Sequence, residues 1–191
     1  PIALQEAIVQ ISFLAINSII NDMGLMQSAG YGVAQKIVSF IMLVPSSIMQ
    51  SVSAFVAQNI GAGKKDRAKA GFFTAIKTGC TVGVVIFLAG FFGGAWMSSL
   101  FTDDSRVILQ SADYLKGFSA ECILTCILFS SIGYFNGYGR SIPVMVQGIS
   151  SAVCIRIPVS VLMSRLPQSS LLLVGLATPI TTVYGIIFFM I

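Results

Sequence analysis

Six apolar segments dominate this sequence, and each reaches about the 20 residues that an α-helix needs to cross the hydrocarbon core of a bilayer. These lengths constrain the fold, because backbone exposed to lipid must satisfy its own hydrogen bonds and a helix does so within one segment. The sequence therefore predicts an all-α, polytopic membrane protein with six transmembrane helices. We place the spans at Ile2–Ile20, Val33–Ile60, Phe72–Phe101, Gly117–Phe135, Ile142–Met163 and Leu171–Ile191.

The composition agrees with a membrane protein. Hydrophobic residues make up 55% of the chain and charged residues only 9%, and the mean hydropathy is +0.90. Soluble domains carry about 25% charged residues, so this chain lacks the polar residues that would cover a water-facing surface. Because the chain starts at Pro1 and stops at Ile191 inside apolar runs, we expect it to be a piece of a longer protein.

Several function classes are disfavoured by residues that the chain lacks. It has no histidine, which excludes His-dependent catalytic triads and His-ligated zinc sites. Its four cysteines lie in apolar runs without a CxxC pair, as expected for small buried hydrophobes. We therefore expect no enzymatic activity, no metal site and no cofactor. The net charge of +4 comes from cations in loops, without an aromatic-interleaved basic face, so we expect no nucleic-acid partner.

Two short motifs resemble known sites but lack essential parts. Gly137-Tyr138-Gly139 is similar to a potassium filter, but Arg140 follows it and would repel potassium. The GAGK sequence at 61–64 is similar to a phosphate loop, but Gln58 stands where the first glycine is required. We therefore assign neither a channel filter nor a nucleotide site.

A compact basic segment at 55–71 (FVAQNIGAGKKDRAKAG) ends the second apolar run. Cytoplasmic loops of membrane proteins carry an excess of lysine and arginine. We therefore predict that loops 61–71 and 136–141 are cytoplasmic, and that both chain ends lie on that side of a plasma or inner membrane. The cations number six on this side (Lys64, Lys65, Arg67, Lys69, Lys77 and Arg140) and three on the other (Arg106, Lys116 and Arg165).

Three local features lead to structural expectations. Pro45, in the middle of the second span, should kink its helix. The segment Asp66–Lys77 has cations on one helical face and aromatic residues on another, which predicts a short amphipathic elbow along the membrane surface. In the third span a glycine stripe predicts close helix packing. Its members are Gly79, Gly83, Gly90 and Gly94.

Polar stripes follow the first two spans at helical spacing. Two neighbouring helices with such faces, one of them bearing methionines, could line a water-filled cavity that accepts varied ligands. The alternative is interhelical hydrogen bonding in a closed bundle. The candidate cavity residues are Gln10, Asn17, Gln35, Ser39, Met42 and Ser46.

Four charged residues lie within the predicted spans: Glu6, Lys36, Glu121 and Arg156. Ionisable groups inside a membrane are costly and suggest function, although Lys36 can snorkel from the end of its helix. Glu121 and Arg156 are equally far along the chain from the loop between the fourth and fifth spans, about 25 Å of helix from the turn. We therefore predict an ion pair between them at one depth. Such a pair would suit a structural role for Glu121 as well as a role in transport.

Five segments together resemble the C-terminal half of a transporter of the MATE (multidrug and toxic compound extrusion) family. They fall in all but one of the predicted spans and keep the family order. The segments are PIALQE (1–6), FIMLVP (40–45), SAFVAQNIGAGKKDRAKA (53–70), GYFNGYGR (133–140) and GLATP (175–179).

The resemblance implies one six-helix lobe of a twelve-helix transporter, whose N-terminal lobe would be the partner of this chain in the lipid bilayer. It implies export of cationic organic drugs or metabolites by sodium- or proton-coupled antiport with alternating access. Family members with a cation site in this lobe use acids on its first and fourth helices, here Glu6 and Glu121. Glu121 lies about one turn further toward the outer face than the family's acid, whose level is occupied by Thr125.

A second function remains open within the same superfamily, namely flipping of a lipid-linked oligosaccharide. Such a flippase would need a more cationic cavity for pyrophosphate, whereas the expected cavity has Glu6 and few cations. The residues do not distinguish sodium from proton coupling, and they do not identify the substrate.

Overall fold

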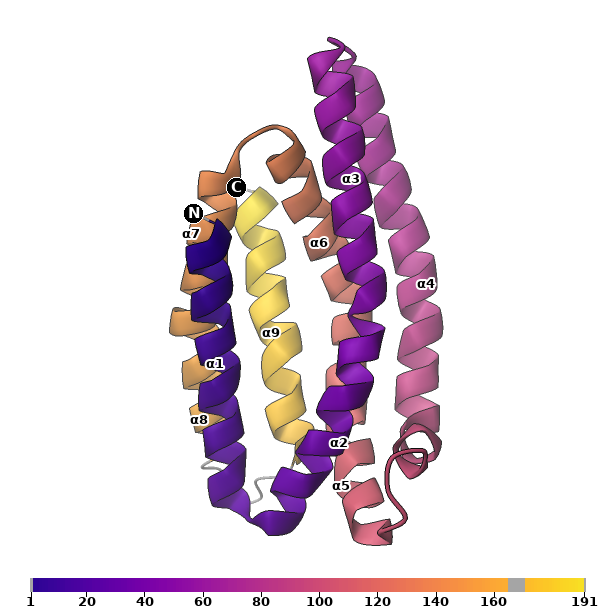
Figure 1. Ribbon diagram of the computed structural model, residues 1–191, viewed down its shortest axis with the longest axis vertical. Helices are drawn as coiled ribbons and strands as arrows, with labels where there is room; N and C mark the ends of the chain where they lie inside the picture. Colours follow the sequence, from indigo (N-terminus) through magenta and orange to yellow (C-terminus); the bar gives the residue numbers. More distant parts are fainter. Residues whose placement is uncertain (1, 165–170, 191) are drawn as a thin grey trace.

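The computed structural model describes residues 2–164 and 171–190, except the side chains of residues 2–4 and 6, and every regular element in this part is a helix. The helices pack into an elongated bundle with their long axes roughly parallel (Figure 1). In chain order they are α1 (Ile2–Met23), α2 (Leu25–Ile41), α3 (Leu43–Gly61), α4 (Lys65–Ser99), α5 (Ser105–Ser119), α6 (Glu121–Gly137), α7 (Ser141–Ser150), the π-helix η1 (Ser151–Arg156), α8 (Ile157–Ser164) and α9 (Leu171–Met190). The predicted all-α fold is confirmed.

The helices group into long apolar segments. Four segments are long and apolar enough to cross a membrane: Leu25–Gly61, Lys65–Ser99, Ser141–Ser164 and Leu171–Met190. The pair α5 and α6, bent by 48°, makes a fifth if it is counted as one span. In α1 the apolar stretch Ala7–Met23 is shorter, so the sixth span remains a prediction.

Several helices begin earlier than the apolar runs predict. The second segment starts at Leu25 instead of Val33, and the helical part of the fourth starts at Ser105 instead of Gly117. The reason is that a search for apolar runs misses amphipathic helical turns. In α5, for example, a polar face leads into a buried face with Tyr114 and Phe118.

The predicted surface elbow at Asp66–Lys77 is wrong. Helix α4 runs unbroken from Lys65 to Ser99, so this segment forms its first turns. Ala68 is fully buried and packs with Val52 and Val56 of α3. Packing of one small residue against α3 therefore holds the polar start of α4 in line with the rest of the helix.

The kink expected near Pro45 is present as a break between α2 and α3 at Met42. Proline has no backbone N–H, so the carbonyl four residues earlier, at Ile41, loses its helical partner. Helix α2 ends at that residue, and Pro45 itself is buried in the first turn of α3.

The glycine stripe of α4 packs closely, as predicted. All four glycines are buried, and they face α5 and α6. A Cβ atom built on Gly83 would lie 2.9 Å from the carbonyl oxygen of Cys122, and one on Gly90 would lie 2.9 Å from Oγ of Ser119. Absence of side chains on this face therefore lets α4 approach the bent α5–α6 pair.

The turns between helices gather at the two ends of the bundle. The α3–α4 turn, the α6–α7 turn, the start of α1 and the end of α9 lie toward one end (Figure 1). The α1–α2 and α4–α5 turns lie at the other. The bundle therefore has the alternating up-and-down course on which the count of loop cations depends.

Candidate functional site

Glu121, the first residue of α6, is buried in the bundle with 6% of its surface exposed. Its Oε1 atom accepts a hydrogen bond of 2.8 Å from Oγ1 of Thr125 and one of 2.6 Å from Oγ1 of Thr182. Its Oε2 atom is also buried but has no hydrogen-bond partner in the part of the chain that the structure describes. The carboxyl group is thus held on one side and free on the other.

Close packing of α9 brings Thr182 to this carboxylate. Gly175 of α9 lies so near α5 that a Cβ atom on it would be 2.7 Å from the carbonyl oxygen of Tyr114. One and two turns further along α9, Thr178 and Thr182 are buried. Sequence reasoning missed Thr182, and the signal that could have found it is the pair of threonines at 181–182 inside an apolar helix.

Arg156 is the last residue of η1 and is half-buried. Its guanidinium lies over the ring of Phe13 in α1, 4.5 Å from the centroid, and Nη1 donates a long hydrogen bond of 3.5 Å to Oγ of Ser12. Its Nε atom is buried without a partner among the described residues. Arg156 thus makes its recorded polar contact and its cation–π contact with α1.

The predicted ion pair between Glu121 and Arg156 is absent. The ion pairs within the described residues are Arg106–Asp104 and Lys116–Asp113, and both lie at the α5 side of the bundle. The equal-depth prediction did not consider direction around the helix axes. Helix α9 contacts both α6 and η1, and its Thr182 side chain takes up one oxygen of Glu121.

The π-helix also affects the direction of Arg156. One extra residue in a helical turn rotates the following side chains by about 100° relative to an uninterrupted α-helix. η1 occupies residues 151–156 in the middle of the fifth segment and packs against α1 and α9. π-bulges occur frequently at functional sites, and here the bulge ends at the charged residue.

Two buried tyrosines complete the surroundings of the charges. Tyr31 of α2 and Tyr114 of α5 meet edge to face with ring centroids 5.1 Å apart. The charge of Arg156 acts on both phenols and on the Glu121 carboxylate. We use the name buried polar cluster for Ser12, Phe13, Tyr31, Tyr114, Glu121, Thr125, Arg156 and Thr182.

The predicted cavity residues lie in different surroundings. Gln10, Asn17 and Ser39 are exposed, and Met42 and Ser46 are half-buried. Ser39 donates a hydrogen bond of 2.8 Å to the carbonyl oxygen of Gln35 within its own helix. The side-chain nitrogen of Gln35 is buried and has no partner in the described part. Part of the predicted cavity lining is therefore open surface of this bundle.

Glu6, the other predicted coupling acid, has a backbone position in α1. Its side chain lies outside the described residues, so its relation to Glu121 stays a prediction.

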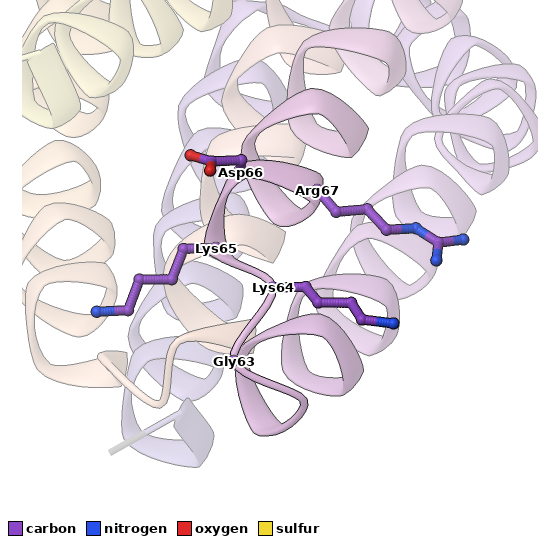
Figure 2. A pocket seen from close by; sticks show the side chains of 5 residues that line it. All are labelled: Gly63, Lys64, Lys65, Asp66 and Arg67. Carbon is purple, nitrogen blue, oxygen red and sulfur yellow. The ribbon is translucent and has the colours of Figure 1, made fainter.

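The basic α3–α4 turn does not form a convergent site. Figure 2 shows that the side chains of Lys64, Lys65 and Arg67 point away from the hollow at this turn in different directions. All three are exposed, and Arg67 lies over the ring of Phe55 at 5.9 Å. Gly63 has φ of 73°, a left-handed conformation that suits glycine in a tight turn. The turn therefore supplies surface charge without a pocket of converging groups.

Comparison with known proteins decides the family. A family model described as MatE matches residues 1–162. The chain belongs to this family. The resemblance carried by the sequence motifs is thereby confirmed, and the apolar helices are those of a multi-pass membrane transporter family.

Curated relatives of this MatE chain are named as transporters or resistance proteins. It is 25% identical to a FAD transporter of Shewanella oneidensis over 95% of this chain and 40% of that protein. It is 29% identical to the probable multidrug resistance protein NorM of Idiomarina loihiensis over 66% of this chain and 27% of that protein. The chain thus spans at most two fifths of the length of these relatives.

Solved MATE structures share the fold. A MOP superfamily transporter from Pyrococcus furiosus superimposes with a TM-score of 0.89 at 14% identity, over 97% of this chain and 41% of that chain. A multidrug resistance MATE transporter in its outward-facing conformation gives a TM-score of 0.89 at 14% identity with the same coverage. An inward-facing conformation gives 0.79 at 14% identity, over 98% of this chain and 44% of that chain.

Proposed function

We propose that this chain is the C-terminal lobe of a MATE transporter that exports organic molecules by antiport against sodium ions or protons. The family match supports a transporter. The solved neighbours, of which this chain covers about two fifths, supply the architecture for an N-terminal lobe as its partner. Both outward-facing and inward-facing neighbours exist, which supports alternating access as the mechanism.

Burial of Glu121 with one unpaired carboxylate oxygen carries the proposal for coupling. A carboxylate inside a membrane is costly and suggests function, and an unpaired buried oxygen is a further cost unless something binds it. Thr125 and Thr182 hold Oε1, which leaves Oε2 free to take a proton or a sodium ion. We assign cation coupling to Glu121 together with Glu6 of α1.

The exposed polar stripe on α1 and α2 supports a substrate path along this lobe. Gln10, Asn17 and Ser39 are polar and exposed, although they belong to helices of a membrane protein. Polar groups at membrane depth face a water-filled cavity or another part of the protein. We propose that they line the cavity between the lobes. An organic cation there and the coupling cation would compete for the acids.

A second substrate class has an observation in its favour. One relative, matched over 95% of this chain, is named a FAD transporter, and FAD is an aromatic anion. The guanidinium of Arg156 over the ring of Phe13 presents a cation and an aromatic face, which together suit a planar anionic molecule. Export of such a molecule is therefore the alternative to export of an organic cation.

We place the protein in the plasma or inner membrane with the α3–α4 and α6–α7 turns in the cytoplasm. Support comes from the excess of cations at that end of the bundle, since lysine and arginine mark cytoplasmic loops. The start of α1 and the end of α9 lie toward the same end.

Transport by the full-length protein in proteoliposomes tests this function. An imposed sodium or proton gradient should drive movement of a fluorescent organic cation or of FAD, and the driving gradient identifies the coupling ion. Glu6→Gln should abolish efflux while expression stays normal. Asp113→Asn, at the partly exposed pair with Lys116, is the matched control and should transport normally. Unaltered efflux by Glu6→Gln would contradict the proposal.

A further inference from the structure

Two complementary atoms of the buried polar cluster are left without partners. Oε2 of Glu121 is a buried acceptor and Nε of Arg156 is a buried donor, and neither has a hydrogen-bond partner among the described residues. The two charges act on each other electrostatically but are not in contact as an ion pair. The chain therefore carries an acid and a cation that could satisfy each other and, in this conformation, do not.

We infer that Arg156 is an internal counter-cation for Glu121, which competes with the coupling cation for the free carboxylate oxygen. The inference rests on the proposed coupling role of Glu121. When the site holds a cation, Arg156 stays on Phe13 and Ser12. When the cation leaves, Arg156 swings to Oε2 and neutralises the carboxylate.

The present position of Arg156 is held by weak contacts. The hydrogen bond to Ser12 is 3.5 Å long, beyond the usual range for N–H···O bonds. Ser12 itself donates a shorter bond of 2.6 Å to the carbonyl oxygen of Val9, so its hydroxyl hydrogen is already engaged. The remaining recorded contact is the cation–π contact with Phe13. A long, flexible side chain held in this way can change partners without unfolding its helix.

An empty Glu121 site needs a counter-charge. Removing one partner of a buried charge is strongly destabilising, because the remaining charge is uncompensated. Thr125 and Thr182 supply hydrogen bonds but no charge. Arg156 is the cation that acts on Glu121 among the described residues. It can therefore stabilise the state in which the coupling cation has left.

Exchange of partners by Arg156 would transmit the state of Glu121 to α1. Phe13 and Ser12 lie on α1, the helix that also carries Glu6 and Gln10. In the cation-bound state Arg156 connects η1 to α1, and in the empty state this connection is lost. The π-helix that presents Arg156 packs on α1, α8 and α9. The arrangement therefore couples ion occupancy to the helix proposed to line the substrate cavity.

Cation titration of the purified full-length protein tests this inference. Thermal unfolding is followed while sodium, and separately proton, concentration is raised, and the half-saturating concentration is read for each. Arg156→Gln should lower that concentration by about tenfold or more, because the competitor is gone. Phe13→Leu should raise it severalfold, since it weakens the alternative position of Arg156. Lys116→Gln, an exposed cation, should leave it unchanged.

The opposite signs distinguish competition from a structural role. If both variants shift the half-saturating concentration in the same direction, or if Arg156→Gln leaves it unchanged, the inference is overturned. If Arg156→Gln does not fold, the rise expected for Phe13→Leu still decides the question. Loss of the cation response in Glu121→Gln is expected. Wild-type protein that responds to neither cation would contradict the proposed coupling site itself, and with it the inference.

Discussion

At the residue scale, the account depends on how one buried carboxyl group is held. Glu121 has hydrogen bonds from Thr125 in its own helix and from Thr182 across the bundle. Hydrogen bonds to a charged group contribute more than those between neutral groups. The two threonines therefore fix the direction of the carboxylate and leave Oε2 as its available atom.

Removal of the cross-helix hydrogen bond should destabilise the protein. Thr182→Val deletes a donor to a buried carboxylate, which costs about 1.5–3 kcal/mol. Chemical unfolding of the purified full-length protein measures this loss. Thr181→Val is the matched control, because Thr181 is equally buried but donates only to the carbonyl oxygen of Ala177 in its own helix. Equal destabilisation by both variants would show that Thr182 has no special role.

Much of the candidate site could be predicted residue by residue, but its connections could not. Glu121 and Arg156 stand out in the sequence because charged residues inside membrane spans are rare. Their depth follows from counting along antiparallel helices. Their directions depend on the π-helix at 151–156 and on α9 between them, and neither leaves a clear pattern in the sequence. The direct ion pair was therefore a wrong prediction.

At the element scale, α4 shows which sequence patterns are reliable. The glycine stripe correctly predicted close packing, because a missing side chain has the same effect wherever two helices touch. The charged segment at its start predicted an elbow, and this was wrong because Ala68 packs against α3. Local polarity indicates what a face can tolerate, whereas tertiary contacts decide whether the helix continues.

Substitution in the glycine stripe tests its packing role. Gly83→Ala places a Cβ atom 2.9 Å from the carbonyl oxygen of Cys122 and 3.0 Å from Cα of Ile123. Backbone atoms cannot rotate away, so we expect a loss of about 1–3 kcal/mol in the free energy of unfolding, as for other overpacked sites. The measurement is unfolding of the full-length protein in detergent.

Gly93→Ala in the same helix is the control. A Cβ atom there meets nothing within 4 Å, so the substitution should be neutral or stabilise the helix by up to about 1 kcal/mol. If Gly83→Ala were as stable as Gly93→Ala, the proposed close packing of α4 on α6 would be contradicted.

At the scale of the whole molecule, the chain is a lobe-sized part of a transporter fold. Its match to the MatE family covers most of its length, while its relatives are much longer. The described surface carries exposed polar residues on α1 and α2 and a buried polar cluster behind them. A lobe organised in this way can bind a coupling ion inside and a substrate on the face toward its partner.

The central claim is that Glu121 couples ion movement to export, and Glu121→Gln in the full-length protein tests it most directly. Two activities are compared in proteoliposomes: transport driven by an imposed sodium or proton gradient, and exchange of labelled for unlabelled substrate without a gradient. Glutamine preserves size and hydrogen bonding but cannot carry the charge. We predict that gradient-driven transport falls by at least tenfold while exchange persists. Gradient-driven transport at the wild-type rate would contradict the account.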